Sequence, residues 1–342
     1  MSAVLAMADA PARWTPARLA GALAFAALCA LALGVAAGSE GWSFDWLQDW
    51  DLISTIRAPR SIGAWVAGAL LGLGGALAQG LFRNPLADPY LLGSAAGAGL
   101  GVVLVICAGT VVGTSIGLAN TGWLLQLGLV GAAFLGALGG VSLTLLLAAG
   151  ATRPMVLLLA GVVVGVLMTA VSDLLMLVSP EAMRAKQVFM LGTTGFLGWR
   201  SVALMGATLL VTLPLAIGLG RVLDALVLGE ATATSLGVDL PRLRLLLVLL
   251  MALCTGTTVA QAGMVAFVGL VAPHLVRRVV VVSHGALLGL SALAGGALLL
   301  VADVVARSVI APQELPVGVL TAVVGGVYLM LLLRRRVRDP HG

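Results

Sequence analysis

The chemically reactive side chains of this sequence are few, and their spacing assembles no catalytic centre. Lys186 is the only lysine, and no GxxxxGK[ST] loop precedes it, so the chain has no phosphate-binding loop with which to hydrolyse a nucleotide by itself. The histidines, His274, His284 and His341, lack the spacing of a metal pair. The three cysteines each lie within an apolar run, and no Ser/His/Asp arrangement stands out. We therefore predict no catalytic residue, no metal site and no cofactor bound by this chain.

Two carboxylates, Asp173 and Asp303, lie late in long apolar runs. Acids inside a membrane are costly to bury and are candidates for function. A self-powered secondary transporter needs coupling-ion residues near the membrane midplane, and Asp173 is only a weak candidate for that role. An intramembrane enzyme needs a nucleophile or a metal constellation, which is missing here. Any transport by this chain is therefore expected to draw its energy from another protein.

The composition is that of an integral membrane protein. Of the 342 residues, 61% are hydrophobic and 10% are charged, whereas soluble domains carry about 25% charged residues. The 45 glycines suit helices that pack closely in lipid, and the lack of strand alternation argues against a barrel. The net charge of +5 is explained by arginines at the membrane faces rather than by binding to nucleic acid.

The apolar runs predict one all-α transmembrane domain over residues 1–342 with about ten spans. The first run is longer than the apolar core of a usual cleaved signal, so we expect it to remain as a span. The expected spans are Leu19–Ala37, Ser61–Phe82, Tyr90–Ala108, Gly122–Ala149, Met155–Val178, Val202–Leu219, Leu245–Gln261, Gly263–Val282, Ala286–Ala306 and Leu315–Leu333. A short helix is expected within residues 179–199. Several spans carry GxxxG contact faces, such as Gly68 with Gly72.

The distribution of basic residues orients this domain. With ten spans both termini lie on one side, and thirteen of the 19 basic residues fall on that side against six on the other. Cytoplasmic loops carry the excess of basic residues. Both termini are therefore predicted in the cytoplasm, with Asp173 and Asp303 near the external ends of their spans.

The longest polar interval in the C-terminal half, Leu223–Arg244, is too regular for a plain linker. Leu223, Leu226 and Val227 recur on one helix face, and Gly229 breaks the pattern. Glu230 then stands in the first turn of a second short helix, which Gly237 ends. The interval predicts two short cytoplasmic helices within 223–240, joined at a glycine hinge. They are either a handle for a soluble partner or an ordinary interfacial loop.

Several separated motifs resemble those of the permease subunits of type II ABC importers for iron-siderophore, haem and cobalamin, the FecCD-like family. They run in order from Arg57 to the C-terminal end, and the stretch from Gln79 to Gly93 is similar to the family's most specific signature. The motifs are Arg57–Arg60, Gln79–Gly93, Leu228–Gly237, Phe267–His274, Ala302–Arg307 and Glu314–Ala322. Two departures stand out. Ser283-His284-Gly285 replaces the family's usual Asp-His-Arg, and Val327 stands where the family usually has a proline that kinks the last span.

The resemblance implies the partners and the energy source. A homodimeric permease in the cell inner membrane would bind two ATPase subunits, which carry the ATP and Mg²⁺, and would receive cargo from a periplasmic substrate-binding protein. The polar interval would then couple to the ATPase, through Leu228, Gly229, Glu230, Ala233, Ser235, Leu236 and Gly237. Arg57, Arg60 and Arg307 match the positions at which this family carries the arginines that dock the binding protein; the alternative is that they only anchor helix ends at lipid headgroups.

The resemblance further implies a pathway along the dimer axis, lined mainly by the fifth and tenth spans. Conduction requires weak, distributed contacts. The spacing of Thr169, Ser172 and Met176 places them on the fifth span as candidates for its lining, with plain helix packing as the alternative. The implied cargo is a bulky metal chelate, a ferric siderophore or haem, with cobalamin as the alternative.

Overall fold

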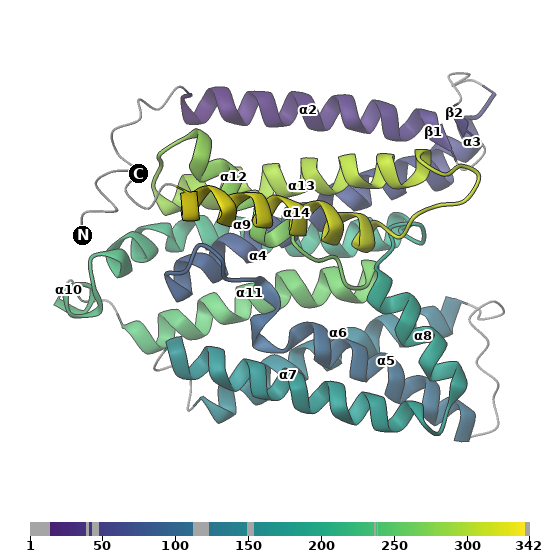
Figure 1. Ribbon diagram of the computed structural model, residues 1–342, viewed down its shortest axis with the longest axis horizontal. Coiled ribbons are helices and arrows are strands. Elements are labelled where there is room, and N and C mark those ends of the chain that lie inside the picture. Colours follow the sequence, from purple (N-terminus) through teal and green to yellow (C-terminus); the bar gives the residue numbers. More distant parts are fainter. Residues whose placement is uncertain are drawn as a thin grey trace.

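The computed structural model describes residues 14–38, 41–42, 48–111, 123–148, 154–235, 237 and 239–338. The chain forms a bundle of long helices (Figure 1). The helices are α2 (Pro16–Ala36), α3 (Trp50–Leu52), π-helix η1 (Ile53–Arg57), α4 (Ala58–Phe82), 3-10 helix η2 (Pro89–Leu92), α5 (Ser94–Val111), α6 (Trp123–Leu147), α7 (Pro154–Met176), α8 (Pro180–Leu191), α9 (Trp199–Val227), α10 (Glu230–Ser235), α11 (Leu240–Ala262), α12 (Val268–Val279), α13 (His284–Ser308) and α14 (Val317–Arg338). Two short strands, β1 (Ala37–Gly38) and β2 (Gly41–Trp42), pair antiparallel.

The ten predicted spans correspond to α2, α4, α5, α6, α7, α9, α11, α12, α13 and α14. Within the described residues, seven helices are long and apolar enough to cross a membrane, and the shorter apolar helices Ser94–Gly109 and Val317–Leu332 add two more. The short helix expected within residues 179–199 is α8, which begins where the side chain of Ser179 accepts a hydrogen bond from Ala182 N. The all-α, multi-span architecture is thus confirmed.

The eighth crossing differs from the others, because α12 has only 12 residues. At 1.5 Å per residue it is about 18 Å long, too short to cross a hydrocarbon core of about 30 Å. The preceding segment, Gly263–Phe267, completes the crossing without being helical. Its backbone groups find partners inside the protein: Met264 N donates to Phe189 O, and Val265 O accepts from the Tyr90 hydroxyl group. Irregular backbone is tolerated at this depth where the protein itself satisfies its polar groups.

Helix α4 is the centre of the bundle, because most of its side chains are buried among α9, α11, α12 and α13. The predicted GxxxG face accounts for the closest of these contacts. A Cβ atom on Gly72 would lie 2.1 Å from the backbone oxygen of Ser291 on α13, and one on Gly68 would lie 2.3 Å from that of Gly295. Backbones approach this closely only where both helices present small residues.

The two predicted partner-binding regions lie at opposite ends of the bundle. Helix α2 begins and α14 ends at the same end as α10, whereas β1, β2, α3 and α8 lie at the opposite end (Figure 1). The polar interval holds one short helix and not two: residues 223–227 are the last turns of the 29-residue α9. The prediction of a separate first helix was wrong because the apolar pattern of Leu223 and Leu226 continues that of α9, and Gly220 does not interrupt the helix.

Candidate functional site

The cytoplasmic candidate site is α10 with its flanking residues. Gly229 (φ +115°) and Gly237 (φ +82°) bound the helix in the left-handed region, where glycine is favoured. Ala233 is buried, while Leu228 and Ser235 are exposed. Leu236 lies outside the described residues. A small helix held between two glycines and exposed on most of its surface can seat in a partner's cleft.

Glu230, the first residue of α10, faces the bundle rather than only solvent. Its Oε1 lies 2.5 Å from Nη2 of Arg244, which is on α11, and 4.0 Å from Nη2 of Arg83, which follows α4. Arg244 is buried, whereas the carboxylate side chain is about half exposed. The sequence placed Glu230 on the partner-facing surface, and the two arginine contacts are long-range features that no local spacing indicates.

The predicted docking arginines belong to a buried ionic network at the external end. Nε of Arg60 lies 3.1 Å from Oδ1 of Asp303, and Nη1 of Arg60 lies 2.9 Å from the carboxylate of Glu314. Nη2 of Arg307 lies 2.5 Å from Oδ2 of Asp303. The Thr194 hydroxyl group donates to Asp303 as well. Helices α4 and α13 and the segment after α8 therefore meet at a single buried carboxylate.

Arg57 lies beside this network and pairs with Asp49 at 3.2 Å. The three arginines are only 2–8% exposed, so they do not form an exposed basic surface. They line a cavity of about 240 Å³ together with Glu314. Among the described residues, Nε of Arg57 and Nε of Arg307 are buried N–H donors with no hydrogen-bond partner. The two Nε atoms are themselves covered by protein, so what the cavity presents to an entering anion is the positive charge of the three arginines, partly offset by Glu314.

A second cavity, of about 650 Å³, runs between α5, α7 and α8. Thr169 and Ser172, two of the three residues predicted to line the pathway, line this cavity, and the third, Met176, packs against the apolar cluster of α5 and α6. At the external end of α7, Asp173 pairs with Lys186 of α8 at 2.7 Å, and both residues line the cavity.

Sequence reasoning missed Asp88, which lines the same cavity. It stands in the loop after α4, where its Oδ1 accepts a hydrogen bond of 2.8 Å from Tyr90 N and so caps η2. Burial raises the pKa of this carboxyl, against the opposing effect of the bond from Tyr90. The Asp-Pro pair is the available local signal, because Asp followed by Pro favours the start of a short helix.

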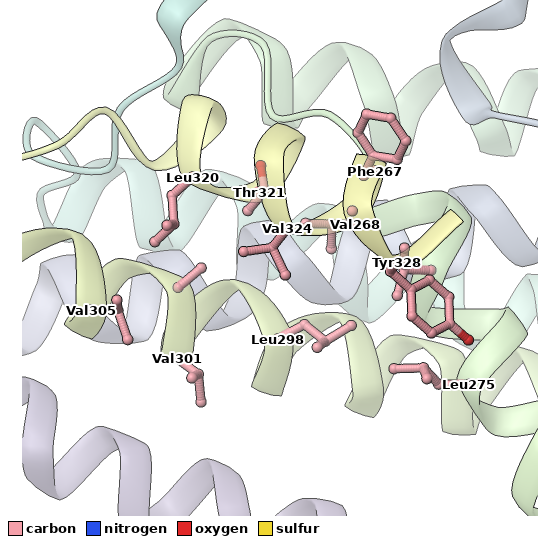
Figure 2. A pocket seen from close by; sticks show the side chains of 13 residues that line it. Phe267, Val268, Leu275, Leu298, Val301, Val305, Leu320, Thr321, Val324 and Tyr328 are labelled. Atoms are coloured by element: carbon pink, nitrogen blue, oxygen red, sulfur yellow. The ribbon is translucent and has the colours of Figure 1, made fainter. Parts of the chain in front are cut away.

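A third, apolar cavity of about 310 Å³ separates α14 from α12 and α13 (Figure 2). Leu298, Val301 and Val305 of α13 face Val324 and Tyr328 of α14 across it. The predicted pathway helices α7 and α14 thus each border a cavity. The departure at Val327 lies within a continuous helix and is half exposed.

The other departure, Ser283-His284-Gly285, forms the start of α13. Asp224 of α9 accepts hydrogen bonds from the backbone N–H of His284, at 3.0 Å, and lies 2.6 Å from its Nδ1. The carboxylate of Asp224, from α9, therefore caps the N-terminus of α13. In the part of the chain that the structure describes, no three His, Cys, Asp or Glu side chains are grouped to hold a metal ion.

Comparison with known proteins extends over nearly the whole chain. The model of the FecCD transport family matches residues 22–335. The hemin transport system permease protein HmuU of Yersinia pestis is 37% identical, covering 86% of each chain. The vitamin B12 import system permease protein BtuC of Pectobacterium atrosepticum is 37% identical, covering 92% of this chain and 93% of that protein.

Two further similarities agree with these. The Fe(3+) dicitrate transport system permease protein FecD of Escherichia coli is 36% identical, covering 84% of this chain and 89% of that protein. A solved ABC transporter assigned to the metal-chelate type, in an inward-facing conformation, aligns with a TM-score of 0.81 at 27% identity. That alignment covers 94% of this chain and 99% of the other.

Proposed function

The chain belongs to the FecCD transport family, and from this membership we propose that it imports a bulky metal chelate, a ferric siderophore or haem. The chain is the non-catalytic, membrane-spanning permease subunit of an ABC importer in the cell inner membrane, and a separate subunit hydrolyses ATP. Membership also implies an ATPase partner, a binding protein and a dimer of permeases.

The chemistry shared by the relatives supports the proposed cargo. Their names assign them to hemin, to vitamin B12 and to Fe(3+) dicitrate, and each of these is an organic complex around a metal ion. An iron chelate is the cargo in our proposal, and cobalamin, the cargo named for the Pectobacterium relative, is the alternative. Most side chains that line the cavity between α5, α7 and α8 are apolar or small, and two of its three Asp and Lys side chains, Asp173 and Lys186, pair with each other. Such a wall gives a sliding cargo the weak and distributed contacts that conduction requires.

At the external end, Arg57, Arg60 and Arg307 dock a periplasmic binding protein. The cavity that they line supports this role, because an acidic side chain of the partner would meet three guanidinium groups around it, and ion pairs between guanidinium and carboxylate groups are strong. The incoming acid would compete with Glu314 for Arg60. Docking in a recess also fixes orientation better than contact with mobile surface arginines would.

At the cytoplasmic end, residues 228–237 form the coupling element that seats in the ATPase. Its small exposed helix between two glycines supports this assignment. Thr169, Ser172 and Met176 are the residues proposed to line the pathway, and the first two line the cavity between α5, α7 and α8. The whole chain acts as one transmembrane domain that binds no cofactor of its own.

The cargo is tested by binding assays on the cognate external binding protein, with hemin, a ferric hydroxamate siderophore, ferric dicitrate and cobalamin as probes. Selectivity in such importers resides largely in that protein. The proposal expects tight binding of one iron chelate and weak binding of cobalamin. The reverse order would replace an iron chelate with cobalamin as the cargo.

A further inference from the structure

We propose that Glu230 acts within this chain as a positioning residue, whose carboxylate ties α10 to Arg244 and Arg83 and so sets the orientation of the coupling helix. The inference rests on the proposed function of residues 228–237 as the ATPase-coupling element. It differs in what it assigns to Glu230: the carboxylate is a link inside the permease and not a charge presented to the ATPase.

The contact with Arg244 carries most of the argument. The Arg244 side chain is 3% exposed, and its Nη2 lies 2.5 Å from Oε1 of Glu230. A guanidinium buried this deeply needs a counter-charge, because removal of one partner of a buried pair leaves an uncompensated charge. Arg244 stands in the first turns of α11, whose neighbours Leu243 and Leu247 are packed in the core. The carboxylate is therefore held at a fixed point of the bundle.

Arg83 supplies a second, independent indication. It ends α4 in the left-handed region, at φ 49° and ψ 34°, where glycine is the residue most often found. An arginine in this conformation is unfavourable relative to glycine, but it places a guanidinium 4.0 Å from Glu230 Oε1. Arg83 thus places a positive charge at the end of α4 close to the Glu230 carboxylate, which Arg244 of α11 also contacts.

Little else fixes α10. Of its six residues only Ala233 is buried, and a glycine with positive φ stands on each side of it. Such glycines are free to change their backbone angles. Without the carboxylate, the helix would pivot between Gly229 and Gly237. When the carboxylate is present, a displacement of α10 also displaces the ends of α4 and α11 that it contacts.

These two helices lead to the cargo cavity. Helix α4 is the buried centre of the bundle, and α11 ends at Ala262, whose carbonyl oxygen accepts a hydrogen bond of 2.8 Å from Thr193 N, just after α8. Lys186 of α8 lines the cavity. The Glu230 contacts therefore join the ATPase-facing surface to the elements that border the cargo.

The test measures amide hydrogen exchange of residues 230–235 in the full-length permease, reconstituted in lipid nanodiscs without the ATPase. Glu230→Gln and Arg244→Gln should each raise exchange of these amides about tenfold, the effect of losing a hydrogen bond to a charged group. Arg83→Gly relieves backbone strain and should raise exchange by a smaller factor without harming folding. The charge swap of Glu230→Arg with Arg244→Glu should restore the slow exchange.

Arg242→Gln is the matched control, because Arg242 is two residues from Arg244 but 89% exposed and paired only with Asp239 among the described contacts. It should leave exchange of α10 unchanged. Exchange in α4 and α11 reports whether Arg244→Gln still folds, and Arg244→Lys, which keeps the charge, should retain most of the protection. Unaltered exchange of α10 in Glu230→Gln would overturn the proposal.

The same variants are then assembled with the ATPase subunit. In Glu230→Gln the proposal expects the permease-dependent change in ATP hydrolysis to fall about fivefold. The charge swap of Glu230→Arg with Arg244→Glu should restore it, because the swap rebuilds the link inside the permease, whereas a charge that contacted the ATPase directly would not be restored by a change at Arg244. A large loss of ATPase affinity that the swap does not rescue would show a direct contact and contradict the inference. A third outcome separates the two proposals. If Glu230→Gln raises the exchange of α10 but binding of the ATPase leaves this exchange unchanged, the internal link is upheld and the proposed coupling function is refuted.

Discussion

The hydroxyl group of Thr194 donates a 2.5 Å hydrogen bond to Oδ1 of Asp303, 109 residues later in the chain. The same carboxylate receives the guanidinium groups of Arg60 and Arg307. The segment that follows α8 is therefore fixed to the residues proposed to dock the binding protein. An acid that enters the external cavity would act on a network that reaches the segment next to α8, which borders the cavity between α5, α7 and α8.

Asp303→Asn should strongly destabilise the permease, because it leaves two buried guanidinium groups without their shared counter-charge. Removing one partner of a buried ion pair typically costs about 3–5 kcal/mol. The measurement is thermal or denaturant unfolding of the purified protein in lipid nanodiscs. Asp239→Asn is the control, because its pair with Arg242 is exposed and such pairs contribute at most about 1 kcal/mol. Equal stability of the two variants would show that the external network does not hold α4 to α13.

Glu314→Gln should strengthen docking of the binding protein. Glu314 is about one-third exposed and forms an ion pair with Arg60 at the edge of the cavity that both residues line. Removing its charge frees Arg60 for an incoming acid, so association should accelerate about two- to fivefold, most clearly at low salt. Association rates are measured with the immobilised permease at two ionic strengths.

Arg57→Gln is the opposing variant and should slow association. Arg57 pairs with the partly exposed Asp49 rather than with Asp303, so its loss disturbs the fold less than changes at Arg60 or Arg307. If neither Glu314→Gln nor Arg57→Gln alters docking at low salt, the arginines serve the fold or anchor helix ends, and the docking proposal fails.

Gly72→Val should disrupt the contact between α4 and α13. Its Cβ would lie 2.1 Å from the backbone oxygen of Ser291, so the helices must separate. Overpacking of this kind costs about 1–3 kcal/mol or more. Gly206→Val on α9 is the control, because a Cβ there meets no atom within 4 Å. Unfolding midpoints of both variants are compared, and equal midpoints would disprove the close helix contact.

Thr169→Trp should block cargo import by filling the cavity between α5, α7 and α8. Assembly with the ATPase and docking of the binding protein should stay intact. Leu167→Trp is the control, because it introduces the same side chain at an exposed position of α7 that does not line this cavity. Uptake in proteoliposomes distinguishes them, and normal import by Thr169→Trp would remove this cavity from the pathway.

The sequence predicted the ten crossings because long apolar runs and arginine distribution are local properties of the chain. The start of α11 has a local signal of the same kind, because the side chain of Asp239 caps the helix just ahead of Pro241. The prediction failed for the first coupling helix, because a polar residue such as Arg221 near the end of a span does not stop a helix whose apolar pattern continues. The eighth crossing was expected within Gly263–Val282, but the non-helical segment that precedes the 12-residue α12 was not.

The candidate sites were predictable only in part. Asp303 and Arg307 stand at i and i+4, a spacing at which two side chains of one helix can pair. The contact of Arg60 with Asp303 spans 243 residues and has no local signal. The burial of Arg60 accompanies this long-range contact, and so could not be derived from spacing. The position of Glu230 against Arg244 likewise depends on how α10 folds back onto α11.

The central claim is that this chain is the permease of an ATP-driven importer of an iron chelate. The direct measurement is uptake of iron-55-labelled hemin, ferric siderophore or ferric dicitrate, with labelled cobalamin in parallel, by proteoliposomes that hold the permease and its ATPase, with the binding protein outside and ATP inside. The account predicts uptake of an iron chelate that requires internal ATP and stops when the ATPase subunit is omitted. Uptake by the permease alone, driven by an ion gradient, would contradict it.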